Sequence, residues 1–252
     1  MRTISVVGIG SGDPGHVTVQ AISALNAADV VFVMDKGEAR AELTDVRKEI
    51  CDRYVGRSCR IVTAADPPRD RGATAYAAAV DDWRARRADI YQRLITAELG
   101  EDQHGAFLAW GDPGIYDSTL PILRDVLDRG AVAFEITVIP GISSIQALAA
   151  RHQVSLTRTG HPLHITTGRR LAAEGFPANA DDVLVMLDAR AAFAAADGDD
   201  EIYWGAYVGT ADEILISGRV RDVAAQIIAA RDAARERHGW IMDTYLLRRP
   251  GG

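Results

Sequence analysis

The sequence predicts an α/β fold made of two α/β domains, at residues 1–139 and 140–252. Apolar runs typical of buried strands alternate with helical patterns through the first half of the chain. After residue 140 the helices become sparser, which indicates a second domain with a different sheet. Three loops rich in glycine and proline each follow a strand-like run, at Gly8-Ile-Gly-Ser-Gly-Asp-Pro-Gly15, Trp110-Gly-Asp-Pro-Gly-Ile-Tyr-Asp-Ser118 and Ile139-Pro-Gly-Ile-Ser-Ser144.

The first three elements are expected to be a strand, a helix and a strand. Residues 4–9 are apolar almost throughout and predict a buried strand, and the run 29–34 predicts a second one. Between them, residues 17–28 place apolar side chains such as Ala21 and Leu25 at helical spacing. This order predicts parallel strands joined by a crossover connection.

The rest of the first domain continues the alternation. The long helix expected to begin at Thr74 has an apolar inner face, and its many charges are interpreted as a solvated outer face. Gly130 is expected to end the following helix, because glycine accepts a left-handed C-cap conformation. The predicted order is helix 38–54, strand 60–63, polar loop 65–72, helix 74–99, strand 106–110, helix 118–129 and strand 134–139.

The second domain is predicted to contain a mixed sheet. Fewer helices separate its strands, so neighbouring strands are expected to run antiparallel in part. The predicted order is helix 143–152, strands 163–167, 183–187 and 201–207, helix 219–237 and a terminal strand 240–247.

Composition excludes several classes of protein. The formal net charge of −7 argues against a nucleic-acid partner, since phosphate binding needs a basic surface. No apolar stretch approaches the roughly 20 residues of a membrane span. The first residues read as a strand that enters a glycine loop and not as a signal peptide, so a cytoplasmic protein is expected. Cys51 and Cys59 have neither redox-motif nor zinc-ribbon spacing and are interpreted as incidental thiols.

The first glycine loop also matches a dinucleotide-binding pattern. Gly10-Ser-Gly-Asp-Pro-Gly15 satisfies G-x-G-x-x-G, and Asp35 follows about twenty residues later. Pro14 argues against this interpretation, because proline has no N–H to donate to a pyrophosphate. A nicotinamide enzyme is therefore kept only as a remote alternative, and it leaves the other two loops unexplained.

Taken with Ala28-Asp-Val-Val31 and the terminal strand, the three loops resemble the tetrapyrrole (precorrin) methylase family over essentially the whole chain. The resemblance implies two α/β domains with a cofactor cleft between them, and S-adenosylmethionine as the cofactor. Some segments resemble in particular the members that methylate precorrin-5 at C-1 and release acetate. These segments are Asp35-Lys-Gly37, Tyr76-Ala-Ala-Ala-Val-Asp-Asp-Trp83, Tyr116-Asp-Ser118, His164-Ile-Thr-Thr-Gly-Arg-Arg170, Ile202-Tyr-Trp-Gly-Ala-Tyr207 and Gly239-Trp-Ile-Met-Asp-Thr-Tyr245.

The resemblance also implies which residues contact the cofactor. In the first domain, the loop around Asp112 has little side-chain bulk, and Asp112 can order it by Asx-type bonds or bond the ligand. Ser143 and Ser144 are expected either to cap the following helix or to bond the methionine portion. The cofactor-binding residues implied are Gly111, Asp112, Gly114, Ile115, Tyr116, Ser143 and Ser144, with Met186, Leu187, Ala206, Tyr207, Ile241 and Met242 on the adenine side.

Methyl transfer needs alignment above all, because the macrocycle supplies the nucleophilic carbon. Release of acetate needs an activated water, for which Asp35 and Tyr116 are the predicted catalytic residues, with His161 and His164 as further candidates. No metal site is expected. Arginines can bind the substrate carboxylates, although the arginine excess equally fits coding bias. The candidates are Arg57, Arg69, Arg71, Arg158, Arg169 and Arg170.

The family resemblance further implies a homodimer formed through the first domain. The helix at 74–99 carries more apolar and aromatic surface than one small sheet obviously covers, which favours the same expectation. In addition to the main prediction and the nicotinamide enzyme, three further functions remain possible interpretations of the sequence. They are a family member acting at another ring carbon, a non-catalytic S-adenosylmethionine-binding protein and a non-catalytic tetrapyrrole-binding protein. The mass of the product formed from precorrin-5 would separate them.

Overall fold

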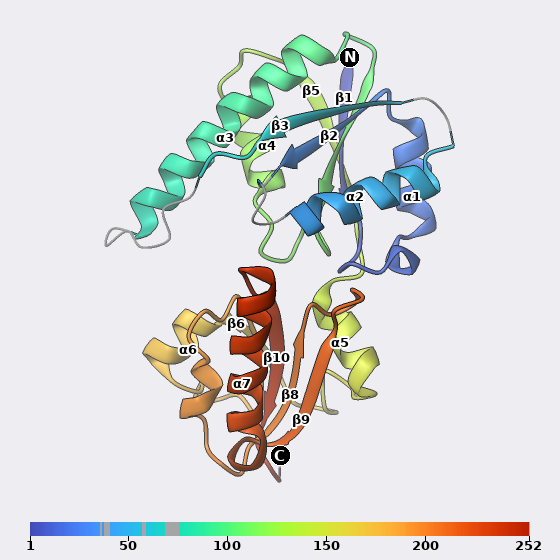
Figure 1. Ribbon diagram of the computed structural model, residues 1–252. Helices are drawn as coiled ribbons and strands as arrows, with labels where there is room; N and C mark the ends of the chain where they lie inside the picture. Colours follow the sequence, from blue (N-terminus) through green and yellow to red (C-terminus); the bar gives the residue numbers. More distant parts are fainter. Residues whose placement is uncertain (36, 38–40, 57–58, 69–75, 252) are drawn as a thin grey trace. The chain divides into compact units, whose positions relative to one another are not determined.

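The computed structural model describes residues 1–252 except 36, 38–40, 57–58, 69–75 and 252 (Figure 1). The chain forms two compact units. The first contains residues 1–10 and 14–142, and the second contains 11–13 and 143–252. The expected boundary followed residue 139, so the division falls three residues later, and the short segment 11–13 groups with the second unit.

The first unit is built on a five-stranded parallel sheet in the order β3-β2-β4-β1-β5. Every strand and helix expected in the first half is present, with ends shifted by a few residues, and the predicted parallel pairing is confirmed. The strands are β1 (Arg2–Gly8), β2 (Val30–Asp35), β3 (Arg60–Ala65), β4 (His104–Ala109) and β5 (Phe134–Ile139); the helices are α1 (Val19–Ala27), α2 (Ala41–Tyr54), α3 (Tyr76–Glu98) and α4 (Thr119–Asp128).

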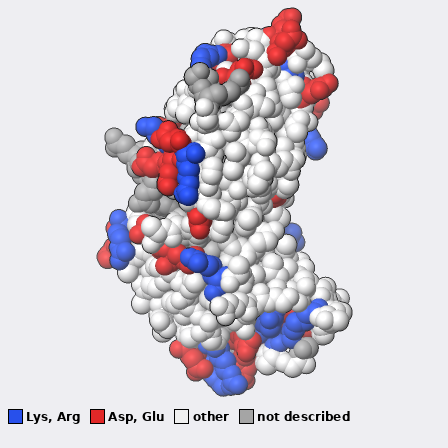
Figure 2. All heavy atoms as spheres, turned by 90° about the vertical axis from the view of Figure 1, so that its right-hand side faces the viewer, with Lys and Arg blue, Asp and Glu red and all other residues white. Residues whose placement is uncertain are grey.

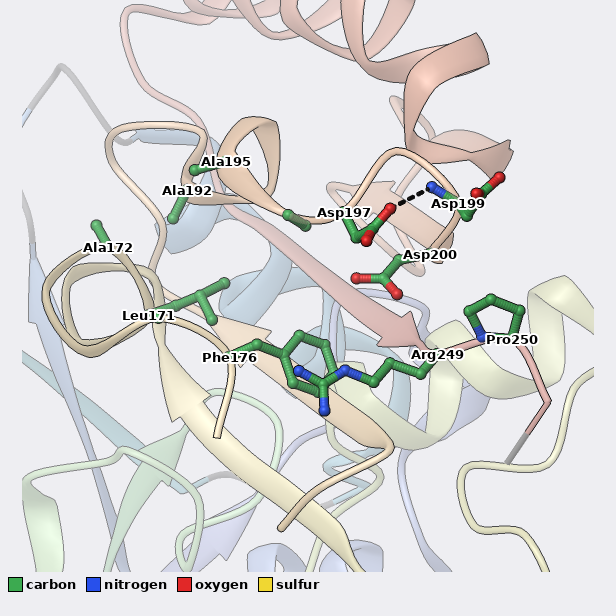
Figure 3. A pocket seen from close by; sticks show the side chains of 12 residues that line it. Leu171, Ala172, Phe176, Ala192, Ala195, Asp197, Asp199, Asp200, Arg249 and Pro250 are labelled. Carbon is green, nitrogen blue, oxygen red and sulfur yellow. Dashed lines mark hydrogen bonds between the residues drawn. The ribbon is translucent and has the colours of Figure 1, made fainter. Parts of the chain in front are cut away.

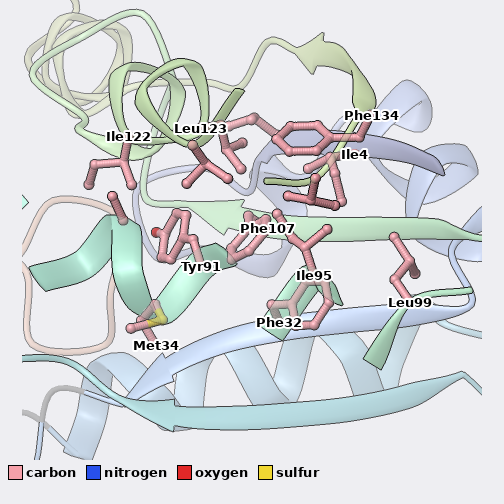
Figure 4. Close-up of a cluster of buried hydrophobic side chains, with 14 of the residues drawn as sticks. Ile4, Phe32, Met34, Tyr91, Ile95, Leu99, Phe107, Ile122, Leu123 and Phe134 are labelled. Carbon is pink, nitrogen blue, oxygen red and sulfur yellow. The ribbon is translucent and has the colours of Figure 1, made fainter. Parts of the chain in front are cut away.

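Helices cover both faces of this sheet. Successive side chains of a strand point to opposite faces, so neighbouring residues of one strand pack against different helices. Val6 packs with residues of α3 and α4, whereas the next residue, Val7, packs with residues of α1 and α2. The α3 side of the core centres on Phe107, whose ring stacks between Phe32 at 4.8 Å and Tyr91 at 4.3 Å, measured between ring centroids (Figure 4). Apolar strands buried on both faces are typical of parallel sheets.

The apolar face of α3 packs into the core of its own unit. Trp83, Tyr91 and Ile95 are buried, while Asp81, Asp82 and other charged residues lie outside. Trp83 also donates its indole N–H to the carbonyl oxygen of Pro67 at 3.1 Å. The described large apolar side chains of α3 are thus buried or partly buried, so the structure gives no support to the surplus apolar surface expected of this helix, and the homodimer remains a prediction.

The second unit contains a mixed five-stranded sheet in the order β6-β7-β10-β8-β9. Only β6 and β7 are parallel, and the other neighbours are antiparallel, which confirms the predicted mixed sheet. The strands are β6 (Leu163–Thr167), β7 (Asp182–Met186), β8 (Glu201–Ala206), β9 (Ile214–Arg219) and β10 (Asp243–Arg248); the helices are α5 (Ser144–His152), α6 (Gly168–Glu174) and α7 (Val220–His238).

Three elements of the second unit were not expected: β9, α6 and the short 3₁₀ helix η3 (Ala192–Ala195). The strand β9 lies at the sheet edge and buries only Ile216, so its sequence has little of the apolar alternation that marks a half-buried strand. The helix α6 has seven residues, too few to show a helical repeat, and its one large buried side chain is Leu171.

The surface carries charges of both signs. On the face drawn in Figure 2, basic side chains lie next to acidic ones in several places. Ion pairs such as Arg129–Asp89, at 2.6 Å between Nη1 and Oδ1, show this local pairing. In the part of the chain that the structure describes, no helix has the length and apolar character needed to cross a membrane.

Candidate functional site

Three glycine loops meet in the first unit at the carboxyl ends of β1, β4 and β5. Gly8 ends β1, while Gly111 and Gly141 follow β4 and β5. A Cβ atom added to Gly8 would lie 2.6 Å from the Gly141 nitrogen and 2.9 Å from the Gly111 oxygen. A Cβ on Gly141 would overlap the same Gly111 oxygen. The loops therefore pack backbone against backbone, with no room for side chains at the point of contact.

Hydrogen bonds fix these loops to one another. Gly111 donates its N–H to the Gly10 oxygen at 2.8 Å and accepts from the Gly10 N–H at 3.3 Å. The Asp112 carboxylate accepts the N–H of Gly114 at 2.7 Å through Oδ1 and that of Gly141 at 2.9 Å through Oδ2. Asp112 thus orders its own loop, as predicted, and also ties it to the third loop.

Tyr116 lies at the exposed end of the second loop in a rare conformation. Its φ is 51°, and 49% of the residue is exposed although the side chain is large and aromatic. A non-glycine residue at positive φ is strained, and such strain concentrates at ligand sites. The side chains of Tyr116 and of the partly exposed Ile115 beside it are thus accessible, and their contact with a ligand remains a prediction.

The two serines after the third loop differ in role. Ser143 is buried and caps α5: its Oγ accepts the Ile145 N–H at 3.2 Å, and its own N–H donates to Gln146 Oε1 at 3.0 Å. This reciprocal capping box favours the capping alternative for Ser143. Ser144 is the first helical residue and partly exposed, which makes it the better candidate for a ligand contact.

The six candidate residues of the second unit lie together at one end of three adjacent strands of its sheet. The strands β7, β10 and β8 are neighbours, and β10 runs antiparallel to both others. The carboxyl ends of β7 and β8 therefore meet the amino end of β10, as the pairs Thr244–Met186 and Asp243–Ala206 show. The residues brought together are Met186, Leu187, Ala206, Tyr207, Ile241 and Met242.

Leu187 and Tyr207 differ in what they offer a ligand. Leu187 has φ 55° and is 60% exposed, an unusual place for a leucine. Tyr207 has φ 50° but is buried; its hydroxyl donates to the Trp240 oxygen at 2.5 Å, and its N–H donates to the Met242 oxygen at 2.9 Å. The Tyr207 carbonyl oxygen also accepts from the Thr210 N–H at 2.9 Å, so the polar groups of Tyr207 are bonded within its own unit, whereas Leu187 presents its side chain to solvent.

Positive φ values pick out the same places independently. Within the described residues, five non-glycine residues have positive φ, and three of them are the predicted site residues Tyr116, Leu187 and Tyr207. The other two, Gln153 and Ala191, are cap residues of short helical segments. Strain that no helix cap explains thus occurs at predicted ligand contacts, which supports the choice of these residues.

A buried network of charged and polar side chains adjoins the candidate residues of the second unit. The sequence analysis did not predict it. It consists of Arg231 on α7, Asp243 at the start of β10, Trp204 on β8, and Asp188 and Tyr245. A signal was present, since Arg231 falls on the same helical face as the buried Val220, Ile227 and Ala234. A charge on the buried face of a helix indicates a buried partner.

Asp35 ends β2, as predicted, and is partly buried. Its Oδ1 accepts the N–H of Gly37 at 3.0 Å, so one carboxylate oxygen is occupied by a local turn. The catalytic role of Asp35 remains a prediction. The neighbouring residue Lys36 of the quoted motif lies outside the described residues.

Most of the candidate histidines and arginines that the structure describes contact other side chains of the protein. His161 Nδ1 lies 2.9 Å from Asp181, and His164 is exposed on the edge strand β6. Arg158 Nε donates to the buried Asp182 at 3.1 Å, and Arg170 pairs with Glu174. Among the described residues no three His, Cys, Asp or Glu side chains form a metal-binding group. Arg57, Arg69 and Arg71 lie outside the described residues.

The first glycine loop lacks dinucleotide-binding geometry. Residues Pro14–His16 form a 3₁₀ turn, and α1 begins only at Val19, capped by Thr18, whose Oγ1 accepts the Ala21 N–H at 3.0 Å. A dinucleotide loop instead passes directly into the helix that receives the pyrophosphate. Here Gly10 is paired with Gly111, so the loop supports the neighbouring glycine loops.

A pocket of about 440 Å³ occurs in the second unit, away from the predicted residues (Figure 3). Asp200 and Arg249 line it beside Phe176, with Arg249 over the Phe176 ring at 4.1 Å. These residues adjoin the Glu201–Arg248 pair, at the opposite end of β8 and β10 from Ala206 and Asp243. None of the predicted cofactor residues lines this pocket.

Comparison with known proteins gives concordant results. Residues 3–224 match the family described as tetrapyrrole (corrin/porphyrin) methylases. The chain is 54% identical over 251 residues to a Sinorhizobium precorrin-6A synthase [deacetylating], covering 99% of this chain and 96% of that protein. A crystal structure of a putative cobalamin synthesis related protein, CobF, from Corynebacterium diphtheriae has a TM-score of 0.83 and 36% identity, covering 99% of each chain.

A more distant structure shares the fold. The uroporphyrin-III C-methyltransferase of Thermus thermophilus, solved with S-adenosyl homocysteine, has a TM-score of 0.59 and 18% identity. The alignment covers 98% of this chain and 92% of that one.

The glycine packing predicts a large penalty for one methyl group. Gly141→Ala should lower the free energy of unfolding by about 2 kcal/mol or more, because its Cβ overlaps the Gly111 oxygen. Gly56→Ala is the matched control, since its Cβ would meet only Asn26 Oδ1 at 3.6 Å. Urea unfolding of both variants measures the difference. Equal stability of the two variants would show that the loops are not tightly packed.

The buried network predicts a specific pH dependence of stability. Burial raises the pKa of Asp243 to about 6 from 3.8, although Arg231 and Trp204 favour the charged form. The folded state then binds the proton more tightly than the unfolded state. The stability contributed by this proton is therefore complete below about pH 4 and lost as pH rises through about 6.

Asp243→Asn should remove this decline, which is on the order of 2 kcal/mol. Asp128→Asn, on the exposed surface of α4, is the matched control and should keep it. Urea unfolding from about pH 4.5 to about pH 7.5 provides the measurement. A decline of the same size in Asp243→Asn would assign the pH dependence to another group.

Proposed function

We propose, from the premise that this chain belongs to the tetrapyrrole (corrin/porphyrin) methylase family, that it methylates precorrin-5 at C-1 and releases acetate to give precorrin-6A. It is an S-adenosylmethionine-dependent methyltransferase of cobalamin biosynthesis. The observation that carries the specific reaction is the 54% identity, over 99% of this chain, to the precorrin-6A synthase [deacetylating].

The described residues of the first unit fit one half of a cofactor site. S-adenosylmethionine supplies an electrophilic methyl group when it is bound. We propose that a ligand contacts the loop at Gly111 and at the exposed Gly114, and Asp112 holds this loop through two hydrogen bonds. The exposed Tyr116 and the partly exposed Ser144 complete this proposed half, and Ser143 supports it as the cap of α5.

The second unit is proposed to supply the adenine-side contacts. Met186 and Leu187 provide apolar surface, and Ile241 and Met242 lie at the adjacent strand end, partly exposed. Ala206 and Tyr207 are buried at the end of β8 and are proposed to contact the ligand there. A rigid arrangement of these groups serves methyl transfer, whose main requirement is orientation of the reacting atoms.

For acetate release we propose that Asp35 holds a water molecule near the acetyl group. Its Oδ1 bonds Gly37, which leaves Oδ2 to accept a hydrogen bond from water. Tyr116 is the second catalytic candidate, because its large side chain is exposed at the end of the second glycine loop. The order of steps is methyl transfer first, since methylation at C-1 changes the conjugation of the neighbouring ring carbons.

We also propose a homodimer that acts in the cytoplasm and uses neither nucleic acid nor a membrane as partner. The dimer is supported by the family resemblance alone, because the apolar face of α3 is used within its own unit. Light scattering at micromolar concentration distinguishes monomer from dimer.

A second candidate function is methylation of a precorrin at another ring carbon. A relative named precorrin-2 C(20)-methyltransferase, from Sinorhizobium, favours keeping it, because it is 27% identical over 67% of this chain. This candidate shares the fold and the cofactor but releases no acetate, so the stoichiometry of acetate separates the two functions.

A single-turnover incubation with precorrin-5 and methyl-labelled S-adenosylmethionine tests the proposal. We expect one labelled methyl group and one acetate for each product molecule. Methylation without acetate would favour the second candidate, and acetate formed without cofactor would contradict the proposed order of steps.

Asp35→Asn is an informative arm of the same experiment. If Asp35 positions the water, this variant should slow acetate release at least about a hundredfold and methyl transfer no more than acetate release. Asp128→Asn, on the exposed face of α4, should leave both yields unchanged. Two intact yields in Asp35→Asn would remove Asp35 from the reaction.

A further inference from the structure

Arg231 is a charged residue in an apolar place. It lies on α7 with 3% of its surface exposed, on the same helical face as the buried Ile227 and Ala234. Burying a guanidinium costs free energy unless its donors are satisfied, and an apolar side chain at this position would avoid that cost. What distinguishes Arg231 is that its guanidinium bonds groups at the end of β7 and at the start of β10.

The first bond of Arg231 holds the end of β7. Its Nη2 donates to the backbone oxygen of Asp188 at 2.7 Å, one residue after Leu187. The Asp188 carboxylate is buried and accepts the N–H groups of Arg190 at 2.9 Å and Ala192 at 2.7 Å. The chain leaving Leu187 is therefore fixed both by its carbonyl and by its side chain.

The second bond holds the start of β10 and, through it, β8. Arg231 Nη1 pairs with Asp243 Oδ2, which also accepts the indole N–H of Trp204 at 2.9 Å. Asp243 immediately follows Met242, whose carbonyl oxygen accepts the Tyr207 N–H. One guanidinium thus connects the ends of three neighbouring strands.

Tyr245 closes the network. Its hydroxyl donates to Asp188 Oδ2 at 2.8 Å from the fully buried interior of β10. The side chain of Asp188 is further confined by α6, because a Cβ on Gly168 would overlap it. The strand end that carries Leu187 at positive φ is therefore held from β10, α6 and α7 together.

We propose that Arg231 is a positioning residue for the cofactor, acting through Asp188 and Asp243 on the strand ends that carry Leu187, Tyr207 and Met242. This inference rests on the proposed function, which places the adenine side of S-adenosylmethionine at these residues. Left-handed residues persist only where the surroundings determine them, and this network is what surrounds them. Loosening it should weaken cofactor binding before it affects the chemical step.

A second buried ion pair in the same sheet serves as an internal comparison. Asp182 is fully buried and accepts from Arg248 Nε at 2.7 Å and Arg158 Nε at 3.1 Å. It lies at the opposite end of β7 and β10 from Leu187 and Met242. If buried ion pairs in this unit only stabilised the fold, disrupting the Arg231–Asp243 pair and disrupting the pairs of Asp182 would change cofactor binding equally.

The test compares matched tyrosine variants. Tyr245→Phe removes the hydroxyl that bonds Asp188, and Tyr203→Phe removes a hydroxyl that bonds Glu201 at 3.0 Å at the far end of β8. We expect Tyr245→Phe to raise the Kd for S-adenosylhomocysteine and the KM for S-adenosylmethionine about fivefold, with kcat changed by less than about twofold. Tyr203→Phe should leave all three unchanged.

A double variant tests Arg231 itself. Arg231→Met combined with Asp243→Leu removes both charges together, so that neither is left unpaired. We expect its Kd for S-adenosylhomocysteine to rise at least about tenfold by calorimetry. Arg248→Met, which leaves Asp182 bonded to Arg158, is the control and should bind normally. Urea unfolding establishes that each variant is folded under the binding conditions.

The outcomes separate this inference from the function on which it rests. An unmodified protein that neither binds S-adenosylhomocysteine nor transfers methyl would contradict the proposed function. Normal binding by the unmodified protein together with normal Kd and KM in folded Tyr245→Phe overturns the positioning role. The same holds if Arg248→Met weakens binding as much as the double variant, since the effect would then be general. If the double variant does not fold, Tyr245→Phe decides.

Discussion

The close packing of three glycine loops is the constraint on which the first unit depends. Where β1, β4 and β5 end, the backbones of Gly8, Gly111 and Gly141 occupy the space that side chains would take. Backbone contacts of this kind are rigid, because they involve no rotatable side chain, and Asp112 reinforces them by bonding two N–H groups. The result is a closely packed junction of loops, beside which Ile115 is partly exposed and Tyr116 is exposed. Orientation of a methyl donor requires this kind of order.

The second unit reaches a comparable result by different means. Its candidate residues lie at the ends of antiparallel neighbours, where no glycine cluster holds the strands. A buried guanidinium instead binds a carbonyl after β7 and a carboxylate at the start of β10. In both units a large apolar or aromatic residue is left exposed at positive φ, Tyr116 in one and Leu187 in the other. A folded protein retains such residues at a cost, which function explains better than packing does.

The sequence could predict the elements of the first half because each carries a strong local signal. Continuous apolar runs specify β1, β2 and β4, and glycine and proline mark where they end. The same reasoning failed for β9 and α6, one at a sheet edge with a single buried residue and the other seven residues long. The surplus surface expected of α3 finds no support among the described residues, because spacing shows which side chains share a face and not how much sheet and neighbouring helix cover it. The candidate site was likewise predicted only in part. The resemblance indicated Tyr116 and Leu187, but the positive φ of these residues and the bonds between Arg231, Asp188 and Asp243 depend on the folded structure.

The proposed cofactor contacts lie at the second glycine loop in the first unit and at the ends of β7, β8 and β10 in the second. A crystal structure of the protein with S-adenosylhomocysteine tests them most directly. We expect ligand contacts with Gly111, Tyr116 and Ser144 and with Leu187, Tyr207 and Met242. A ligand seated instead against the Gly10–Gly15 loop alone, or in the pocket lined by Phe176 and Arg249, would contradict the account.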